Sequence, residues 1–314
     1  MMQQIWLFTG LVTFSGFMFS FGYACQLAYF GKEFQSSYKR MLMTAVKPLI
    51  AFYISGMYWR AFVDKDFSLR TLLRILVLKD IPPFSEFLVS FSLVILVSLL
   101  FFNQIQYLME KKSEFWIVCL LLLLTTFVPY QLININQMGL LIGTDKFPTY
   151  PVVQYFPLFL LGAYFAKHKI VRDRRVFVVS LSGLIAFLIF YLPEQVAPSR
   201  FPPSLLWIMA SLFLVYSYYQ IARRLSTQRV LNHLLSTWGK NVLFYLLISN
   251  ILIFTFRGAY QPVLLHPIAS FGLTVLMLLT ITFLTTIVAV PKPAIVPVST
   301  TKTVEFSPQE VNLK

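Results

Sequence analysis

The sequence predicts an all-α protein, a polytopic bundle of about nine membrane-spanning helices with one further helix lying along the membrane surface. The 314 residues are 58% hydrophobic, 17% aromatic and only 12% charged, which no soluble globular class matches. Apolar runs of roughly 16 to 22 residues recur along the chain, and such runs are long enough to cross a bilayer. Lys and Arg gather between these runs, as they do in the cytoplasmic loops of membrane proteins.

The clearest run begins at Pro151, and no charged residue occurs from there to Ala166. Five basic residues follow within nine positions, which is typical of a helix that leaves the membrane on its cytoplasmic side: Lys167, Lys169, Arg172, Arg174 and Arg175. Gly162 and Ala163 have small side chains that allow a neighbouring helix to approach closely. We therefore expect this helix to lie inside the bundle.

The other elements follow from the same two signals, apolar length and flanking charge. Charges recur too often between Val63 and Asp80 for a crossing, so this stretch predicts an amphipathic helix on the membrane surface. Lys47, next to the second run, is expected to extend to the lipid headgroups. Residues 1–290 form the predicted transmembrane domain, and 291–314 a disordered tail. The expected spans are Ile5–Phe30, Pro48–Ala61, Phe84–Phe102, Phe115–Ile133, Pro151–Ala166, Val176–Leu192, Leu205–Ile221, Val242–Phe256 and Phe271–Val290.

The distribution of basic residues predicts an orientation in the plasma membrane. Loops after the odd-numbered spans, with the tail, hold 17 Lys and Arg against 8 on the opposite side, Lys47 being left out. This bias places the N-terminus outside and the C-terminus in the cytoplasm. Anionic lipid headgroups and loop placement also account for the net charge of +14, so nucleic acid is not an expected partner.

Residue types that hold metals or carry out nucleophilic catalysis do not form a recognisable pattern. Cys25 and Cys119 lie in apolar runs and are expected to be buried as small hydrophobic residues. The three histidines, at positions 168, 233 and 266, have no metal-ligand spacing. No glycine-rich nucleotide loop or serine triad motif is present, so no metal and no bound cofactor are predicted.

Five segments, in order along most of the chain, resemble the integral-membrane acyltransferase type 3 superfamily, near the branch of heparan-α-glucosaminide N-acetyltransferase. They are FSGFMFSFGY, FSEFLVSF, FPLFLLGAYFAKHK, SRFPPSLLWIMASLFLVYS and WGKNVLFYLLIS. The resemblance implies a ten-helix bundle that passes an acyl group, acetyl first of all, from acyl-CoA as co-substrate to a cell-surface or lipid-linked carbohydrate. The protein would then be an acyltransferase with a carbohydrate acceptor and the lipid bilayer as partners.

The chain departs from the family pattern at two places. The family's first helix carries an Arg and a His proposed to act in acyl transfer, and no residue before Ile5 supplies either one. A His that the family often has near Leu247, Ile248 and Ser249 is also missing. The chain thus resembles such an enzyme without its leading helix, and we expect little or no acyl transfer unless a separately encoded helix or another copy of the chain completes it.

Glu86 is the candidate catalytic residue, because a carboxylate near the membrane interior can act as a general base. The alternative is a structural carboxylate paired with a basic group. Lys167, His168 and Lys169 are candidates for contacting the phosphates of CoA, or else form a plain cytoplasmic cluster. Arg200 could hold an acidic or phosphorylated glycan, or be a simple surface residue.

Asn241 and Tyr245 are further candidates for substrate binding, along an acyl channel. Helix packing is the alternative for both residues, and His266 is expected to lie at the interface. A non-enzymatic role is the competing hypothesis for the whole chain, either as a transporter of a lipid-linked sugar or as a degenerate partner subunit.

Overall fold

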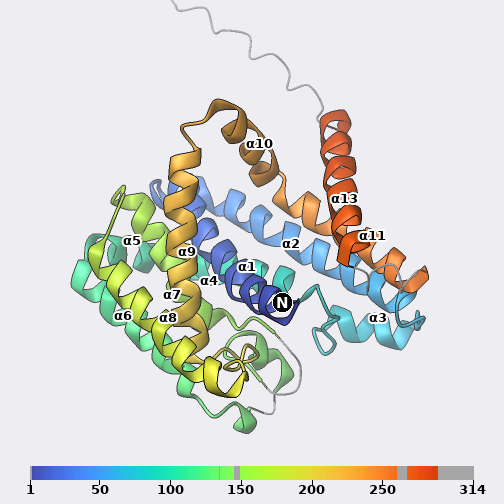
Figure 1. Ribbon diagram of the computed structural model, residues 1–314, viewed down its shortest axis with the longest axis horizontal. Coiled ribbons are helices and arrows are strands. Elements are labelled where there is room, and N and C mark those ends of the chain that lie inside the picture. The colour runs from blue at the N-terminus through green and yellow to red at the C-terminus, as the bar shows by residue number, and fades with distance from the viewer. Residues whose placement is uncertain (1, 134, 145–148, 260–266, 289–314) are drawn as a thin grey trace, which may run out of the picture.

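The computed structural model describes residues 2–133, 135–144, 149–259 and 267–288, and these residues are mostly helical (Figure 1). No strand occurs among them beyond a single bridge between Arg200 and Pro203. The predicted all-α class is therefore confirmed. The helices are α1 (Met2–Cys25) with a π-helical turn (Gln26–Phe30), α2 (Phe34–Phe62), α3 (Leu69–Leu76), α4 (Glu86–Leu100), α5 (Phe102–Glu110), α6 (Lys112–Leu124), α7 (Val152–Lys167), α8 (Arg174–Glu194), α9 (Leu205–Leu225), α10 (Arg229–Lys240), α11 (Val242–Ala259) and α13 (Pro267–Val288).

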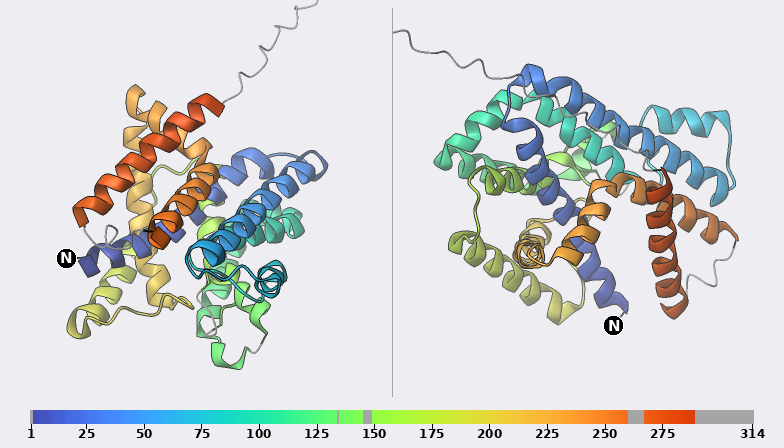
Figure 2. Two further views of the ribbon diagram at one scale, coloured as in Figure 1. Left: turned by 90° about the vertical axis from the view of Figure 1, so that its right-hand side faces the viewer. Right: turned by 90° about the horizontal axis from the view of Figure 1, so that it is seen from above.

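Helix α7 lies at the centre of the bundle, as the sequence predicted. Apart from Val153 and Lys167, every residue of this 16-residue helix is buried. Helix α7 packs mainly against α1, and α4, α5 and α6 also contact it. Helices α8 and α9 pack on one another at one side, whereas α13 stands at the opposite edge beside α11 (Figures 1 and 2).

Two glycines allow α1 and α7 to touch backbone to backbone. A Cβ atom built on Gly22 would lie 1.9 Å from the carbonyl oxygen of Phe159. A Cβ on Gly162 would lie 1.9 Å from the carbonyl oxygen of Phe19. Since no real Cβ atom approaches an oxygen so closely, the crossing requires glycine on both helices, which is the use of small residues found in membrane helix pairs.

Five described helices are long and apolar enough to cross a membrane, and the number rises to six if the bent pair α4 and α5 forms one span. These two helices meet at an angle of 77°. Helices α7 and α11 are apolar but shorter, and α6 has only 13 residues, about 20 Å against a hydrocarbon core of about 30 Å. The prediction of nine spans is therefore not confirmed.

The second and fourth predicted spans have different boundaries in the structure. Helix α2 begins at Phe34, not near Pro48, so Lys47 and Pro48 lie inside a 29-residue helix. Helix α6 ends at Leu124, and 3-10 turns follow. The hydroxyls of Thr125 and Thr126 donate to the carbonyls of Leu122 and Leu123 at 2.6 and 2.7 Å, which closes the helix end.

The predicted amphipathic stretch contains the short helix α3. Ser68 caps its N-terminus by accepting a hydrogen bond from the Thr71 amide at 3.3 Å. Arg60 at the end of α2 forms ion pairs with Asp80, at 2.6 Å, and with Asp64. The Tyr53 hydroxyl of α2 donates to the Leu76 carbonyl of α3 at 3.2 Å, which joins the two helices, while Leu69 and Leu73 remain exposed. Its position along a membrane surface stays a prediction.

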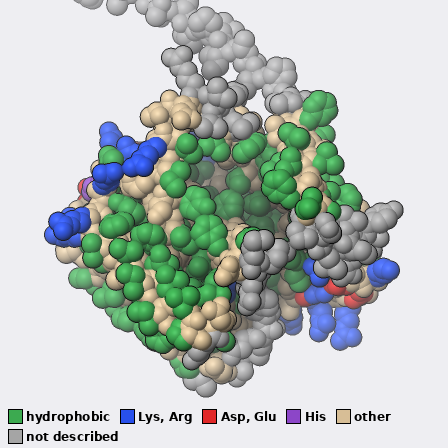
Figure 3. All heavy atoms as spheres, viewed as in Figure 1, with side chains coloured by type: hydrophobic (Ala, Val, Ile, Leu, Met, Phe, Trp, Pro, Cys, Tyr) green, Lys and Arg blue, Asp and Glu red, His purple; other side chains and the backbone are tan. Residues whose placement is uncertain are grey.

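Hydrophobic side chains cover most of the face shown in Figure 3, with Lys and Arg gathered towards two edges. The outer sides of α8 and α13 expose large apolar residues such as Ile189 and Phe283. This surface is consistent with a membrane protein. The orientation in the membrane stays a prediction, and the tail predicted at 291–314 lies outside the described residues.

Candidate functional site

Glu86 is the first residue of α4, and a tight turn holds it in place. Two prolines, Pro82 and Pro83, precede it, and the Ser85 hydroxyl donates to the carbonyl of Pro82 at 2.6 Å. The Glu86 residue is half-buried, but its Oε2 atom is fully buried and has no hydrogen-bond partner in the part of the chain that the structure describes. A buried carboxylate oxygen without a donor costs free energy, which makes Glu86 a candidate for a role beyond packing.

Arg200 lies in the loop between α8 and α9 and extends towards the same region. Its guanidinium donates a hydrogen bond to the hydroxyl of Tyr150. It also lies over two aromatic rings, 4.7 Å from the ring centre of Phe201 and 5.4 Å from that of Tyr150. A Cβ on Gly10 of α1 would come within 3.3 Å of Arg200 Nη1, so the glycine leaves room for the guanidinium.

Tyr150 connects these two residues, and the sequence analysis did not single it out. Its side chain is only 5% exposed, and burial raises the pKa of its hydroxyl. The ring stacks on Phe14 with centroids 3.9 Å apart. The Tyr150 carbonyl accepts a hydrogen bond from the Ser90 hydroxyl at 2.7 Å, which ties it to α4 one turn after Glu86.

Glu86, Tyr150 and Arg200 form what we call the Glu86 cluster. The charge of Arg200 acts on both Glu86 and Tyr150, and Glu86 acts on Tyr150, so the three groups are within electrostatic range of one another. A carboxylate can take up a proton, and a guanidinium and a phenol can donate hydrogen bonds to developing negative charge. The structure thus brings together two residues predicted from the sequence, Glu86 and Arg200, and adds Tyr150.

Asn250 of α11 is a second residue that the sequence analysis missed. Its Nδ2 atom donates to the Ser55 hydroxyl of α2 at 3.0 Å and to the carbonyl of Phe84 at 3.1 Å. Phe84 has a positive φ of 63°, which is unusual for a non-glycine residue and costs about 1–3 kcal/mol. Asn250 helps to hold this conformation two residues before Glu86. A lone amide in an apolar span was its only sequence signal.

The predicted CoA-contacting residues lie at the far end of α7. Lys167 forms an ion pair with Glu110 at 2.5 Å, and His168 Nε2 lies 2.9 Å from the carbonyl oxygen of Met109. A polar cavity of about 680 Å³ adjoins this end, with Gln26, Lys32, Gln106 and Lys167 among its lining residues. His168 and Lys169 do not line it.

The remaining predicted residues form hydrogen bonds away from the Glu86 cluster. Asn241 is exposed, and its side chain donates to the Thr237 carbonyl at 3.1 Å. Tyr245 is buried and donates to Thr282 at 2.9 Å, which joins α11 to α13. His266 lies outside the described residues.

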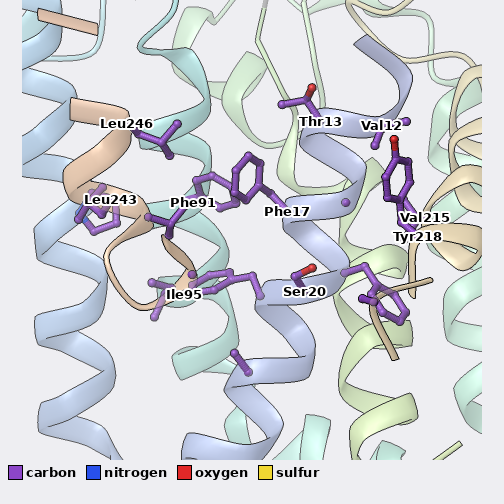
Figure 4. Close-up of a pocket in the computed structure, with 18 of the residues that line it drawn as sticks. Val12, Thr13, Phe17, Ser20, Phe91, Ile95, Val215, Tyr218, Leu243 and Leu246 are labelled. Carbon is purple, nitrogen blue, oxygen red and sulfur yellow. The ribbon is translucent and has the colours of Figure 1, made fainter. Parts of the chain in front are cut away.

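A second, largely apolar cavity of about 870 Å³ lies between α1, α2, α4, α9 and α11 (Figure 4). Phe17 and Phe91 line it. Phe91 also contacts Phe14, with ring centroids 5.6 Å apart, and Phe14 stacks on Tyr150. Ring contacts therefore run from the cavity wall at Phe91 through Phe14 to Tyr150 of the Glu86 cluster.

Among the described residues, no group of three or more His, Cys, Asp or Glu side chains is arranged so that it could hold a metal ion. Cys25 and Cys119 are buried free thiols, as the sequence predicted. Comparison of the chain with protein-family models, with curated proteins and with solved structures finds no match.

Proposed function

We propose that this protein is an integral membrane acyltransferase that passes an acyl group, acetyl first of all, from acyl-CoA to a hydroxyl or amine of a cell-surface or lipid-linked carbohydrate. The observation that carries the proposal is the buried Oε2 atom of Glu86, which has no hydrogen-bond partner in the described structure and lies within electrostatic range of Arg200 and Tyr150. The resemblance of five segments to the type 3 acyltransferases supports the same reaction class.

In this mechanism Glu86 is the general base. It takes the proton from the acceptor hydroxyl or amine as that atom attacks the thioester carbonyl carbon. The carbon–sulfur bond then breaks, and the leaving CoA thiolate takes the proton from Glu86. General base catalysis of this kind contributes about 10²- to 10⁴-fold to a rate. No enzyme cofactor takes part, because CoA is the acyl carrier.

Arg200 and Tyr150 supply the positive charge and the hydrogen-bond donors in this proposal. Donors aimed at the oxyanion of the tetrahedral intermediate stabilise it, and one such donor is worth about 10²- to 10³-fold in kcat. Arg200 also suits an acceptor that carries a carboxylate or phosphate, because its planar guanidinium binds such groups at two points.

The Glu86 cluster and the basic residues that follow α7 lie at opposite ends of this helix. The 16-residue helix is about 24 Å long, with Tyr150 just before it and Lys167 at its end. We propose that the basic end, with Lys167, His168 and Lys169, faces the cytoplasm and receives the phosphates of CoA, and that the arm of CoA that carries the acyl thioester extends along α7 to the Glu86 cluster. The Glu86 cluster then lies towards the outer side of a plasma membrane, where the acceptor is found.

The competing proposal is a non-enzymatic membrane protein, either a transporter of a lipid-linked sugar or a degenerate partner subunit. The family pattern favours it, since the His that the family often has near Leu247, Ile248 and Ser249 is missing.

Labelled acetyl-CoA distinguishes the two proposals. Membranes containing the protein are incubated with it, and label in the glycan fraction is compared for wild type, Glu86→Gln and Glu114→Gln. Glu114 is an exposed carboxylate at the start of α6 and serves as the matched control. If this chain transfers the acyl group without a further helix, the wild type and the control label the glycan, and Glu86→Gln loses at least about 10²-fold of the transfer rate. Equal transfer by all three would refute the role of Glu86, and no transfer above empty membranes would favour the non-enzymatic proposal.

A further inference from the structure

The apolar cavity between α1, α2, α4, α9 and α11 contains one charged side chain, that of Lys47. The other lining residues include Val12, Phe17, Ile95, Leu243 and Leu246, so the walls are mainly hydrocarbon. At about 870 Å³, the cavity falls within the range of about 300–1,000 Å³ typical of small-molecule sites.

Lys47 lies near the middle of α2, 13 residues after Phe34 and 15 before Phe62. Lys47 is exposed, as are Lys39 and Arg40 about two turns earlier on the same helix. The position of Lys47 relative to the membrane surface stays a prediction. An exposed ammonium group beside an apolar cavity is accessible to an anionic headgroup of the surrounding lipid.

Among the described residues, no acidic side chain lines the cavity and none forms an ion pair with Lys47. Hydroxyl groups lie around the same space, on Thr13, Ser20 and Tyr218 (Figure 4). The pocket therefore offers one positive charge, a few hydroxyl groups and a long apolar wall. An occupant that complements all three is an anion with a hydrocarbon chain.

We propose that this cavity binds a long-chain phosphate lipid of the bilayer, with the phosphate at Lys47 and the chain along α1 and α11. Lysine binds phosphate as a point charge, and the hydroxyls of Ser20 and Tyr218, which line the same cavity, can donate further hydrogen bonds to the ligand. The site is separate from the Glu86 cluster and does not depend on acyl transfer. It assigns the protein a phosphate-lipid ligand, whichever function it performs.

Two variants test the charge and the chain separately. Lys47→Met removes the charge and keeps an unbranched apolar side chain. Lys39→Met does the same at another exposed position of α2, which does not line the cavity. Gly16 lines the cavity, and a Cβ built on it meets only Val12, at 4.0 Å, so Gly16→Leu fills the pocket without a backbone clash. Gly272→Leu on α13 is its control, because nothing lies within 4 Å of a Cβ there.

The experiment uses the full chain in phosphatidylcholine nanodiscs that contain a trace of a photoreactive long-chain alkyl phosphate. After irradiation, labelled peptides are quantified. We expect labelling of peptides from α1 and α11, competed by unlabelled alkyl phosphate and not by inorganic phosphate. Losing a hydrogen bond to a charged group weakens binding about tenfold or more, so Lys47→Met and Gly16→Leu should lose most of the label while both controls and Lys47→Arg keep it.

Three results would overturn the proposal. The first is equal labelling of Lys47→Met and wild type, which would exclude a role for the charge. The second is equal labelling by a photoreactive long-chain alcohol, which would show an apolar site without preference for phosphate. The third is competition by inorganic phosphate as effective as by the lipid, which would indicate a soluble anion as the ligand. Monodisperse elution of each variant shows that a loss of label does not come from unfolding.

Discussion

Replacing Gly162 by alanine should destabilise the protein severely, although the substitution adds one methyl group. The added Cβ would lie 1.9 Å from the carbonyl oxygen of Phe19 and 3.0 Å from the amide nitrogen of Tyr23. Both are backbone atoms of α1, so no side-chain rotation relieves the clash. Helices α1 and α7 have to separate by more than about 1 Å. Because protein interiors are packed about as densely as organic crystals, this movement opens gaps between the two helices.

We expect Gly162→Ala to lower the free energy of unfolding by at least about 3 kcal/mol, the upper end of the usual range for overpacking. This corresponds to more than a hundredfold in the folding equilibrium constant. Thermal unfolding of the purified protein in detergent measures it, with Gly272→Ala as the control. Glycine is unfavourable inside a helix by about 0.5–1 kcal/mol relative to alanine, and Gly272 has open space around it, so the control should be neutral or slightly stabilising. A Gly162→Ala protein as stable as the control would refute the close contact of α1 and α7.

Three further predictions concern the bundle and its orientation. Asn250→Leu should lower the free energy of unfolding by about 1–3 kcal/mol in the same assay, because the Ser55 hydroxyl and the Phe84 carbonyl lose their shared donor. The control Asn241→Ala should change it little. Equal effects of the two substitutions would contradict the role of Asn250 in joining α11 to α2 and Phe84. A reporter fused after Lys314 should be active in the cytoplasm and one inserted at 194–200 outside, and the reverse would overturn the proposed orientation. Cysteines replacing Arg70 and Arg74 one at a time should react with a membrane-impermeant reagent from the same side, and labelling from opposite sides would show that the stretch crosses.

The sequence predicted those features that depend on composition and local spacing. The helical class, the burial of α7 beside Gly162, and the separate amphipathic segment all come from apolar length, small residues and charge spacing. Helix boundaries were less predictable where polar and apolar signals conflict. Basic residues Lys39, Arg40 and Lys47 suggested a loop and a short span, yet α2 continues through all three because the rest of its turns bury an apolar face.

The candidate site was predictable only in part, because its members come from distant segments. Glu86 was found as a carboxylate in an apolar run, and Arg200 as an isolated basic residue. Glu86 and Arg200 come together because of how α4 packs beside α7 and how the loop before α9 runs. No local sequence pattern predicts that packing. Tyr150 is one of 16 tyrosines, and no local signal distinguishes it from the others.

The central claim is that Glu86 and Arg200 act together in acyl transfer, and a double-mutant cycle on the rate of label transfer tests it most directly. The rate from labelled acetyl-CoA to glycan is measured for wild type, Glu86→Gln, Arg200→Lys and the double variant. Groups that act as a unit have non-additive effects, so we predict a loss of about 10²- to 10⁴-fold for Glu86→Gln and little further loss in the double variant. Wild-type transfer by Glu86→Gln, or two losses that simply multiply, would contradict the account.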